Sequence, residues 1–478
     1  MDIKTLFPEH EGIEITGIQV DNRQVEPGDL FVCIPGYTVD GHDFALQAQA
    51  AGAVAVVCQR PIPNLEIPQI QVENTHIELP RLAHLFFDKP TTKMNLFGVT
   101  GTNGKTTTAY ILEHLLTGFS TATGYIGTNG IRFADVTLEP KNTTPEPYSL
   151  QHTFNHMVDK GVRNVAMEVS SHALELHRVD YCQFQQTIFT NLTPEHLDFH
   201  PDMEHYYQAK AKLFRMMVPG GTAVINVDDA YGERLATELR GDGINVMTYG
   251  IEKAADLHAS HVKMNALGTQ FKLTTKDGEF ELQTPLLGTF NVYNGLAALG
   301  AVLANGMPLE TAIVLLATLP NIDGRMELIN EGQDFTVIVD YAHTPDGVQK
   351  VLEFVSDIKE RDVSVVIGCP GDRDRTKRPV IAKLSMDYAD DVIFTTDDPH
   401  SEDPKAILDE MTKGMEGEYE VILDRIEAIE AAIAKAKKND ILVIAGRGHQ
   451  KLQYWKSGNI ELDDREVTRE LLRKRVNS

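Results

Sequence analysis

Short apolar runs and amphipathic stretches alternate along the chain and divide it into three parts. In the first part, four apolar runs have the length of strands and one alanine-rich run has the period of a helix: Glu14–Val20, Leu30–Ile34, Ala53–Val57 and Ile67–Val72 for the strands, and Phe44–Ala51 for the helix. Strands interleaved with a helix predict a small N-terminal α/β domain. A polar stretch around Pro90 has the composition of a linker, so we place this domain at residues 1–92.

The second part, residues 93–322, has the pattern of a larger parallel sheet. Helical stretches separate its strands, as in a doubly wound sheet, and the predicted strands are Leu96–Val99, Asn164–Val169, Thr187–Thr190 and Thr222–Val227. Two later segments, Gln270–Thr275 and Glu279–Thr284, alternate apolar and polar residues and predict a short antiparallel insertion. A long apolar helix follows and ends at Gly306.

The third part, residues 323–478, alternates strands with helices and predicts a Rossmann-like α/β domain. The strands are Phe335–Val339, Val363–Ile367, Val392–Thr395 and Ile441–Ile444, and the helices are Gly347–Phe354, Ala406–Lys413 and Arg425–Lys438. Each strand ends in a polar cluster: DYAHTPD, GCPGDRDRTKR, TTDDPHSED and AGRGHQ. Ligands of open α/β sheets bind beyond the carboxyl ends of the strands, so we expect a site at this edge.

Composition narrows the class of protein. The formal net charge of −25 argues against a general nucleic-acid surface, which needs lysine and arginine to meet phosphate. No apolar run reaches the roughly 18 residues of a membrane span, and the N-terminus lacks the pattern of a signal peptide. The four cysteines are scattered singly, which favours neither a zinc site nor a disulfide framework. We therefore expect a cytoplasmic protein that binds neither nucleic acid nor membrane.

The stretch LFGVTGTNGKTT, residues 96–107, is the strongest motif. An apolar strand leads into the turn Gly101-Thr102-Asn103-Gly104, and Lys105, Thr106 and Thr107 open a helix. Val99 stands where the full phosphate-loop signature has its first glycine, so this is the shortened form of the loop. Backbone N–H groups and the helix N-terminus would cradle phosphates, Lys105 would neutralise their charge, and Thr106 would face a Mg²⁺ ion. The motif predicts binding of a nucleoside triphosphate.

Three further residues could act beside this loop. Glu168 closes a predicted strand, where it could hold Mg²⁺ or simply be solvated. His196 follows the strand Thr187–Thr190 and could be a metal ligand or a capping group. Lys210 lies on a predicted helix and would ordinarily be a surface lysine; only after capturing carbon dioxide as a carbamate could it offer oxygen to a metal.

With these residues in place, the sequence resembles the Mur ligases, the family that builds the peptide stem of the bacterial cell wall. The resemblance covers essentially the whole chain, and its motifs are GTNGKTT (Gly101–Thr107), NTTPE (Asn142–Glu146), MEVSSHAL (Met167–Leu174), NLTPEHLDFH (Asn191–His200), AKAKLF (Ala209–Phe214), FNVYN (Phe290–Asn294), GRME (Gly324–Glu327), DYAHTPD (Asp340–Asp346) and GDRDRTKRP (Gly371–Pro379). NTTPE, SSHAL and the run Gly36–His42 are most similar to the members that add the third amino acid.

The resemblance implies roles for residues in the first two domains. The UDP end of the substrate would be held by Val20, Asn22, Tyr37, Thr38 and Val39, and the sugar nucleotide by Asn142, Thr143, Thr144, Ser170 and Arg178. ATP would be contacted by Gly101–Thr107 with Asn291, Asn294, Arg325 and Asp340, and Mg²⁺ would lie near Thr106, Glu168, His196 and Lys210. Leu176 stands where members that use diaminopimelate often carry a glutamine.

The implied reaction is amide-bond formation driven by ATP, with Lys105, His196 and Lys210, the last as N6-carboxylysine, as the catalytic residues. The partners would be UDP-N-acetylmuramoyl-L-Ala-D-Glu, an amino acid and ATP, and the enzyme would be a monomer. Two other readings stay open: a ligase similar to folylpolyglutamate synthase, and a non-catalytic nucleotide-binding protein that kept the fold.

The amino acid would be read by the third domain through Arg373, Asp397, Asp398, Pro399, His400, Gly446 and Gln450. Members that take meso-diaminopimelate carry D-N-P-R and G-K-G-H-E, where this chain has D-D-P-H, residues 397–400, and G-R-G-H-Q, residues 446–450. The arginine for the distal carboxylate is absent and Asp398 is an additional acid, which favours a side chain ending in a lone ammonium. We therefore expect L-lysine, with meso-diaminopimelate as the alternative and L-ornithine third.

Overall fold

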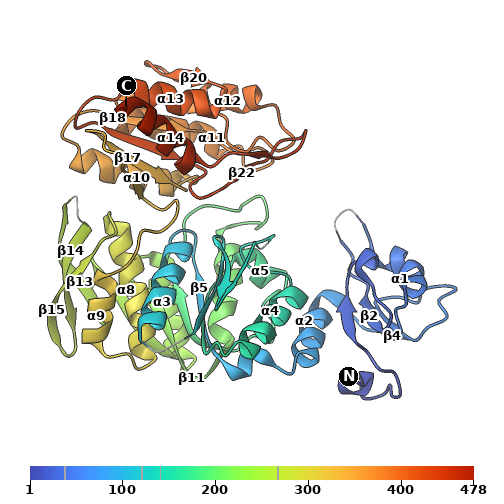
Figure 1. Ribbon diagram of the computed structural model, residues 1–478. Helices are drawn as coiled ribbons and strands as arrows, with labels where there is room; N and C mark the ends of the chain where they lie inside the picture. The colour runs from blue at the N-terminus through green and yellow to red at the C-terminus, as the bar shows by residue number, and fades with distance from the viewer. Residues whose placement is uncertain (37–38, 120–121, 140, 266–267, 478) are drawn as a thin grey trace.

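The computed structural model describes residues 1–36, 39–119, 122–139, 141–265 and 268–477. Three α/β units follow one another along the chain, and Figure 1 shows the first at the right, the second in the centre and the third above the second. The expected three-domain α/β fold is confirmed, whereas the boundaries at residues 92 and 322 stay predictions. None of the described helices has the length and apolarity that a membrane span requires.

The first unit is built on a four-stranded parallel sheet in the order β1-β2-β3-β4. Its elements are β1 (Gly17–Gln19), β2 (Asp29–Val32), α1 (Ala45–Ala51), β3 (Ala55–Cys58), β4 (Gln69–Gln71) and α2 (Thr75–Phe86). The predicted strands and helix are all present, and the strands are shorter than the apolar runs that predicted them. Helix α2 leads toward the central unit and packs against its helix α4 (Pro147–Asp159).

The central unit is built on an eleven-stranded sheet in the order β15-β14-β13-β12-β11-β10-β5-β9-β6-β7-β8. Its strands are β5 (Asn95–Thr100), β6 (Thr123–Gly127), β7 (Gly130–Phe133), β8 (Val136–Leu138), β9 (Asn164–Glu168), β10 (Phe184–Phe189), β11 (Met217–Asn226), β12 (Asn245–Gly250), β13 (Leu257–Asn265), β14 (Gly268–Thr275) and β15 (Gly278–Thr284). The middle strands are parallel, as in the predicted doubly wound sheet.

Helices cover both faces of this sheet. They are α3 (Lys105–Phe119), α4, α5 (Ser171–Glu175), α6 (Met203–Ala211), α7 (Ala230–Gly241), α8 (Thr289–Ala304) and α9 (Leu309–Ala317). The apolar face predicted for α3, with Ile111, Leu112 and Leu115, packs in one core cluster with Leu296 and Leu299 of α8. Helices α3 and α8 pack against each other, and this packing holds the start of α3 beside the carboxyl end of β5.

The antiparallel strands predicted after residue 256 are present as β14 and β15. Strand β13 pairs in parallel with β12, and β14 and β15 then continue the same sheet antiparallel. The predicted antiparallel pair is therefore confirmed, and it extends the central sheet. Alternation of apolar and polar residues identifies the strands but not the edge of the sheet on which they pair.

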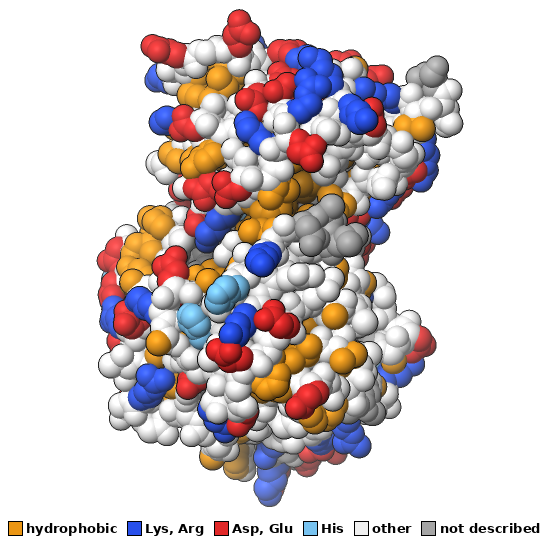
Figure 2. Space-filling view, turned by 90° about the vertical axis from the view of Figure 1, so that its left-hand side faces the viewer, with side chains coloured by type: hydrophobic (Ala, Val, Ile, Leu, Met, Phe, Trp, Pro, Cys, Tyr) orange, Lys and Arg blue, Asp and Glu red, His pale blue; other side chains and the backbone are white. Residues whose placement is uncertain are grey.

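The third unit is built on a six-stranded sheet in the order β16-β17-β21-β18-β19-β20, with a two-stranded ribbon, β22-β23. Its elements are β16 (Glu327–Ile329), β17 (Thr336–Asp340), α10 (Pro345–Ile358), β18 (Val363–Ile367), α11 (Lys377–Tyr388), β19 (Asp391–Thr395), α12 (Pro404–Thr412), β20 (Glu420–Ile422), α13 (Arg425–Lys435), β21 (Ile441–Ala445), β22 (Leu452–Gln453), β23 (Ile460–Glu461) and α14 (Asp464–Val476). Figure 2 shows the molecule narrowing where this unit meets the central one.

Candidate active site

The glycine-rich turn joins β5 to α3 at the carboxyl end of the central strands. Gly101 and Gly104 both have positive φ, at 151° and 86°. A Cβ at Gly101 would lie 1.8 Å from Thr190 Oγ1, and one at Gly104 would lie 2.4 Å from Asn294 Oδ1. Only glycine fits at these two positions, and the fifteen-residue helix α3 directs its N-terminus at the turn. The turn has the geometry of an anion-binding loop.

Two lysines point into the base of this loop. Lys105 Nζ donates to the carbonyls of Gly101, at 2.9 Å, and Thr102, at 2.8 Å. Lys210 Nζ, from α6, donates to the same Gly101 carbonyl at 2.8 Å and lies 4.5 Å from the centre of the Tyr206 ring. Lys210 is 1% exposed, so the ordinary reading of a surface lysine is wrong. Burial first, and then the charge of Lys105, place the pKa of Lys210 well below its ordinary value.

Glu168 lies at the end of β9 and is fully buried, so the alternative of a solvated glutamate is wrong. Its carboxylate accepts hydrogen bonds from Thr106 Oγ1 and Tyr125 OH, both at 2.9 Å, and from the Thr128 N–H at 2.8 Å. One buried carboxylate beside a threonine hydroxyl and a phosphate loop is a donor set that suits Mg²⁺, which takes its other ligands from phosphates and water. Within the described residues, no three His, Cys, Asp or Glu side chains form a metal cluster of their own.

His196 stands in the loop after β10, in a left-handed conformation with φ at 57°. Its ring centre lies 4.8 Å from that of His172 and 6.1 Å from that of Tyr206. Burial lowers the pKa of His196 to about 2, and the nearby charges of His172, Lys105 and Lys210 add to the shift. The imidazole is therefore neutral, which is the form that ligates a metal. His172 and Tyr206 were not among the predicted site residues, although His172 stands inside the motif MEVSSHAL and Tyr206 shortly before AKAKLF.

Residues of the third unit reach the phosphate loop. Arg325 Nη2 donates to Thr106 Oγ1 at 3.0 Å, and its guanidinium lies 4.5 Å from the centre of the Tyr341 ring. Asn103 Nδ2 donates to Asp346 Oδ2 at 2.6 Å. Asp340, 7% exposed, accepts from the Met326 N–H at 2.7 Å and thereby fixes the turn that carries Arg325. Asp346 was not among the predicted site residues, though it ends the quoted motif DYAHTPD.

The two predicted asparagines of α8 are buried behind the loop. Asn291 Nδ2 donates to the Leu287 carbonyl at 2.7 Å, and Asn294 Nδ2 donates to Asn291 Oδ1 at 2.9 Å. Thr108 Oγ1 lies 3.3 Å from Asn294 Oδ1. The structure thus brings Asn294 directly against the phosphate loop, with Asn291 one turn earlier in support.

The residues predicted to hold the sugar nucleotide gather around the end of β9. Thr144 Oγ1 donates to the Glu168 carbonyl at 2.9 Å and accepts from the Ser170 N–H at 3.1 Å. Arg178 Nη1 donates to the Thr144 carbonyl at 3.3 Å. The remaining contacts are Arg178 Nη2 with Glu146 at 2.7 Å, Asn142 Nδ2 with Glu146 at 3.3 Å, and Thr143 Oγ1 with Thr128 Oγ1 at 3.1 Å.

The residues predicted to hold the UDP end lie on the first unit. Val20 and Val39 are 43% and 61% exposed, so their apolar side chains are accessible to a ligand. Asn22 Nδ2 donates to Gln47 Oε1 at 2.7 Å. Tyr37 and Thr38 lie outside the described residues.

The residues predicted to read the amino acid occupy adjoining loops of the third unit. Asp397 is buried, and its Oδ2 finds no hydrogen-bond partner among the residues that the structure describes. His400 has φ at 50° and its ring stacks on Tyr454, with ring centres 5.7 Å apart. Arg373 is exposed and donates to the Asp372 carbonyl at 3.3 Å. The remaining backbone contacts are the Gly446 N–H with the Asp340 carbonyl at 3.1 Å, the Gln450 N–H with the Arg447 carbonyl at 3.0 Å, and the Glu402 N–H with the Pro399 carbonyl at 3.0 Å.

Asp398 does not face a ligand as a free acid. Its carboxylate forms an ion pair with Arg447, which is fully buried, and accepts from the Tyr454 N–H at 3.2 Å. Two of the four departures from the family motifs, Asp398 and Arg447, therefore satisfy each other. Burial and Asp397 raise the pKa of Asp398, and Arg447 opposes the shift. The acidic surroundings from which we expected a preference for L-lysine are neutralised inside the protein.

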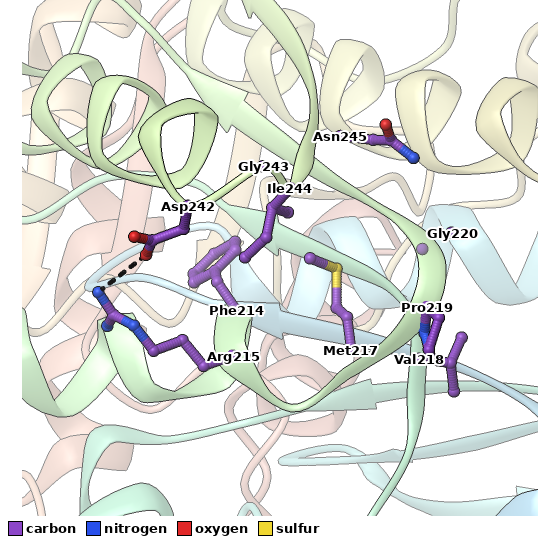
Figure 3. Close-up of a pocket in the computed structure, with 11 residues that line it drawn as sticks. Phe214, Arg215, Met217, Val218, Pro219, Gly220, Asp242, Gly243, Ile244 and Asn245 are labelled. Atoms are coloured by element: carbon purple, nitrogen blue, oxygen red, sulfur yellow. Dashed lines mark ion pairs between the residues drawn. The ribbon is translucent and has the colours of Figure 1, made fainter.

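A cavity of about 350 Å³ lies at the amino-terminal ends of β11 and β12, away from the phosphate loop at the carboxyl ends of the strands (Figure 3). Arg215 and Asp242 form an ion pair of 3.6 Å at its rim. It contains none of the predicted site residues.

Comparison with known proteins agrees with the motifs. Three family models match: "Mur ligase family, catalytic domain" over residues 14–86, "Mur ligase middle domain" over residues 99–302, and "Mur ligase, glutamate ligase domain" over residues 324–448. A relative from Bacillus cereus, named UDP-N-acetylmuramoyl-L-alanyl-D-glutamate–2,6-diaminopimelate ligase, is 46% identical over 98% of this chain and 96% of its own. A protein of the same name from Listeria monocytogenes is 42% identical over 98% and 96%.

Solved structures give the same picture. A structure of a 2,6-diaminopimelate ligase of this kind superposes with a TM-score of 0.72 at 29% identity over 100% of both chains. A folylpolyglutamate synthase from Mycobacterium tuberculosis reaches 0.65 at 17% identity and covers 77% of this chain and 92% of its own, which shows a shared fold alone. On the family models and the full-length relatives together, the chain belongs to the Mur ligase family, the ATP-dependent ligases of peptidoglycan synthesis.

Proposed function

We propose that this enzyme joins 2,6-diaminopimelate to UDP-N-acetylmuramoyl-L-Ala-D-Glu. The observation that carries the proposal is the 46% identity, over nearly the whole of both chains, to a relative named for that reaction. The comparisons favour our alternative over L-lysine, which we expected from the acidic motif. That expectation treated Asp398 as a charge offered to the substrate, whereas Asp398 pairs with Arg447.

The chemistry starts at the terminal carboxylate of the UDP-linked substrate, which attacks the γ-phosphate of ATP to form an acyl phosphate and ADP. Lys105 and the N-terminus of α3 stabilise the transferring phosphoryl group. Thr106 and Glu168 would hold Mg²⁺, which offsets phosphate charge when bound. The amine of the incoming amino acid then attacks the acyl carbon, phosphate leaves, and the amine loses a proton.

Exclusion of water matters for this sequence of steps, because an acyl phosphate exposed to water hydrolyses. The contacts of Arg325 with Thr106 and of Asp346 with Asn103 hold the third unit over the phosphate loop. We propose that Asn294, Arg325 and Asp340 complete the ATP site in this arrangement, and that Arg373 and His400 turn toward the amino acid when it binds.

We also propose that Lys210 works as a carbamate. Its unprotonated amine adds to carbon dioxide and releases one proton, giving a group with two oxygens and one negative charge. The support is the burial of Lys210 and the lowered pKa of its amine, since the free amine is the form that reacts. We also propose that the enzyme is a monomer and that it acts in the cytoplasm on small-molecule substrates.

The test is phosphate release by the purified protein with ATP, Mg²⁺, bicarbonate and UDP-N-acetylmuramoyl-L-Ala-D-Glu. meso-Diaminopimelate, L-lysine and L-ornithine are offered separately at equal concentration. Turnover with diaminopimelate at least tenfold above the other two is the expected result. Preference for L-lysine would overturn diaminopimelate as the proposed substrate, and no turnover with any of the three would overturn the proposed ligase reaction.

A further inference from the structure

One buried ion pair joins the third unit to the central one. Lys377 Nζ lies 3.7 Å from Glu195 Oε1. The two side chains are 5% and 11% exposed, so most of the pair is shielded from water. Lys377 is the first residue of α11, four residues after Arg373, and Glu195 directly precedes His196. The pair therefore links the loop of the amino-acid site to the loop beside the phosphate site.

The next residue along the helix, Arg378, forms no ion pair with the described residues of the central unit. Arg378 is also buried, but it is paired within its own unit, with Glu402 at 2.9 Å and Glu410 at 2.6 Å. The carboxylate that the structure pairs with Lys377 belongs to the other unit. When the units separate, Lys377 and Glu195 both become accessible to water, and the interaction is lost.

We propose that Glu195 and Lys377 are positioning residues for the ligation, and that their ion pair stabilises the closed arrangement of the third unit on the central unit. Removing one partner leaves a single charge shielded in the closed form, which is costly there and harmless in the open form, where water solvates it. The equilibrium then shifts toward the open form. Removing both charges relieves this cost. The proposal rests on the proposed ligase function for its kinetic effect, but not for the closure itself.

The kinetic test compares Lys377→Met, Glu195→Gln and the double variant. Each single variant should raise the KM for ATP and for the amino acid about tenfold, since ligands must now supply the closure, with a smaller change in kcat. The double variant should lie closer to the wild type than either single variant. Lys383→Met is the matched control, because Lys383 is exposed on the same helix and pairs with Asp387 at 2.8 Å.

Two kinetic outcomes would overturn the pairing. If the effects of the single variants multiply in the double variant, the residues act independently. If Lys377→Met abolishes turnover while Glu195→Gln leaves it unchanged, Lys377 acts directly on substrate and is no partner of Glu195.

A second measurement does not depend on activity. Spin labels on cysteines placed at Gln208 of α6 and Asp409 of α12, both exposed, report the distance between the two units. The four native cysteines are buried and free, so they offer few sites for the label. Each single variant should shift the distance distribution of the ligand-free protein toward the open form, and the double variant should reverse part of that shift. Unchanged distributions would overturn the proposal, even if the wild type proved to have no ligase activity.

Discussion

Lys105 and Lys210 donate to the same acceptor, the carbonyl oxygen of Gly101, at 2.9 and 2.8 Å. Two ammonium groups on one carbonyl would repel each other, and burial penalises both charges. The pKa of Lys105 is lowered, chiefly by burial, and that of Lys210 is lowered further, by burial and by Lys105. Burial and the neighbouring ammonium group thus favour the free amine at Lys210 more strongly than at Lys105.

The lowered pKa of Lys210 should make the stability of the protein depend on pH. Lys210 binds fewer protons in the folded state than in the unfolded state between its folded pKa and its ordinary value of about 10.4, so in that window stability rises with pH. The variant Lys210→Met replaces the amine by an uncharged side chain and so removes the free-energy cost of burying a protonated lysine. In bicarbonate-free buffer at pH 7, we expect the variant to have a Tm about 2–4 °C above the wild type, with the gap closing as pH approaches 10. Scanning calorimetry across pH measures it, and a variant less stable at pH 7 would contradict the prediction.

Glu168→Gln tests the carboxylate of the proposed Mg²⁺ site. A glutamine amide replaces one oxygen that accepts from Thr106 or Tyr125 and removes the negative charge. We expect kcat to fall about 100- to 1,000-fold and the Mg²⁺ concentration for half-maximal rate to rise. The measurement is phosphate release against Mg²⁺ concentration. Glu113→Gln is the control, since Glu113 pairs with Arg132 at 2.6 Å, and its Mg²⁺ dependence should stay that of the wild type.

Asp398→Asn tests whether Asp398 serves the fold or the substrate. The variant removes the close ion partner of the buried Arg447 and leaves it beside Asp464, which is 3.9 Å away and already paired with Arg425. We therefore expect a loss of about 3 kcal/mol in the free energy of unfolding. The ratio of kcat/KM for diaminopimelate and L-lysine should change little in the protein that remains folded. Denaturant unfolding and the two-substrate assay measure these quantities. Asp387→Asn, at an exposed pair on α11, should cost under about 1 kcal/mol. A stable Asp398→Asn variant with altered substrate preference would restore the ammonium-reading interpretation.

The sequence predicts those parts of the fold that depend on local pattern. The strands around the phosphate loop and the apolar face of α3 follow from periodicity, and Gly101 and Gly104 stand where only glycine fits. Pairing between distant segments leaves no such local signal. Asp398 and Arg447 are 49 residues apart, and each alone reads as a free charge. The same holds for Lys377 and Glu195, which meet only because the third unit closes over the central one.

His400 provides the most direct test of substrate choice. Its pKa is lowered, chiefly by burial and then by Arg373, which favours the neutral imidazole in the free enzyme. A neutral imidazole offers a distal carboxylate a hydrogen bond without charge, whereas arginine would add a charge-assisted pair. His400→Arg also restores the arginine of the D-N-P-R motif, while Asp398 still departs from it. We expect this variant to lower the KM for meso-diaminopimelate about tenfold, and to leave the KM for L-lysine equal or higher, because lysine has no distal carboxylate.

The same residue gives a pH dependence with a defined sign. Lowering the pH from 8 to 6 increases the protonated fraction of His400, so the KM for meso-diaminopimelate should fall in the wild type and stay constant in His400→Arg, whose guanidinium is charged throughout. Tyr454→Leu is the companion variant, because it removes the ring on which His400 stacks while leaving the imidazole in place. It should weaken diaminopimelate binding less than His400→Ala does. If His400→Arg instead impairs diaminopimelate and L-lysine equally, His400 shapes the loop without reading the carboxylate, and discrimination must come from Arg373 or from the turn at residues 446–450.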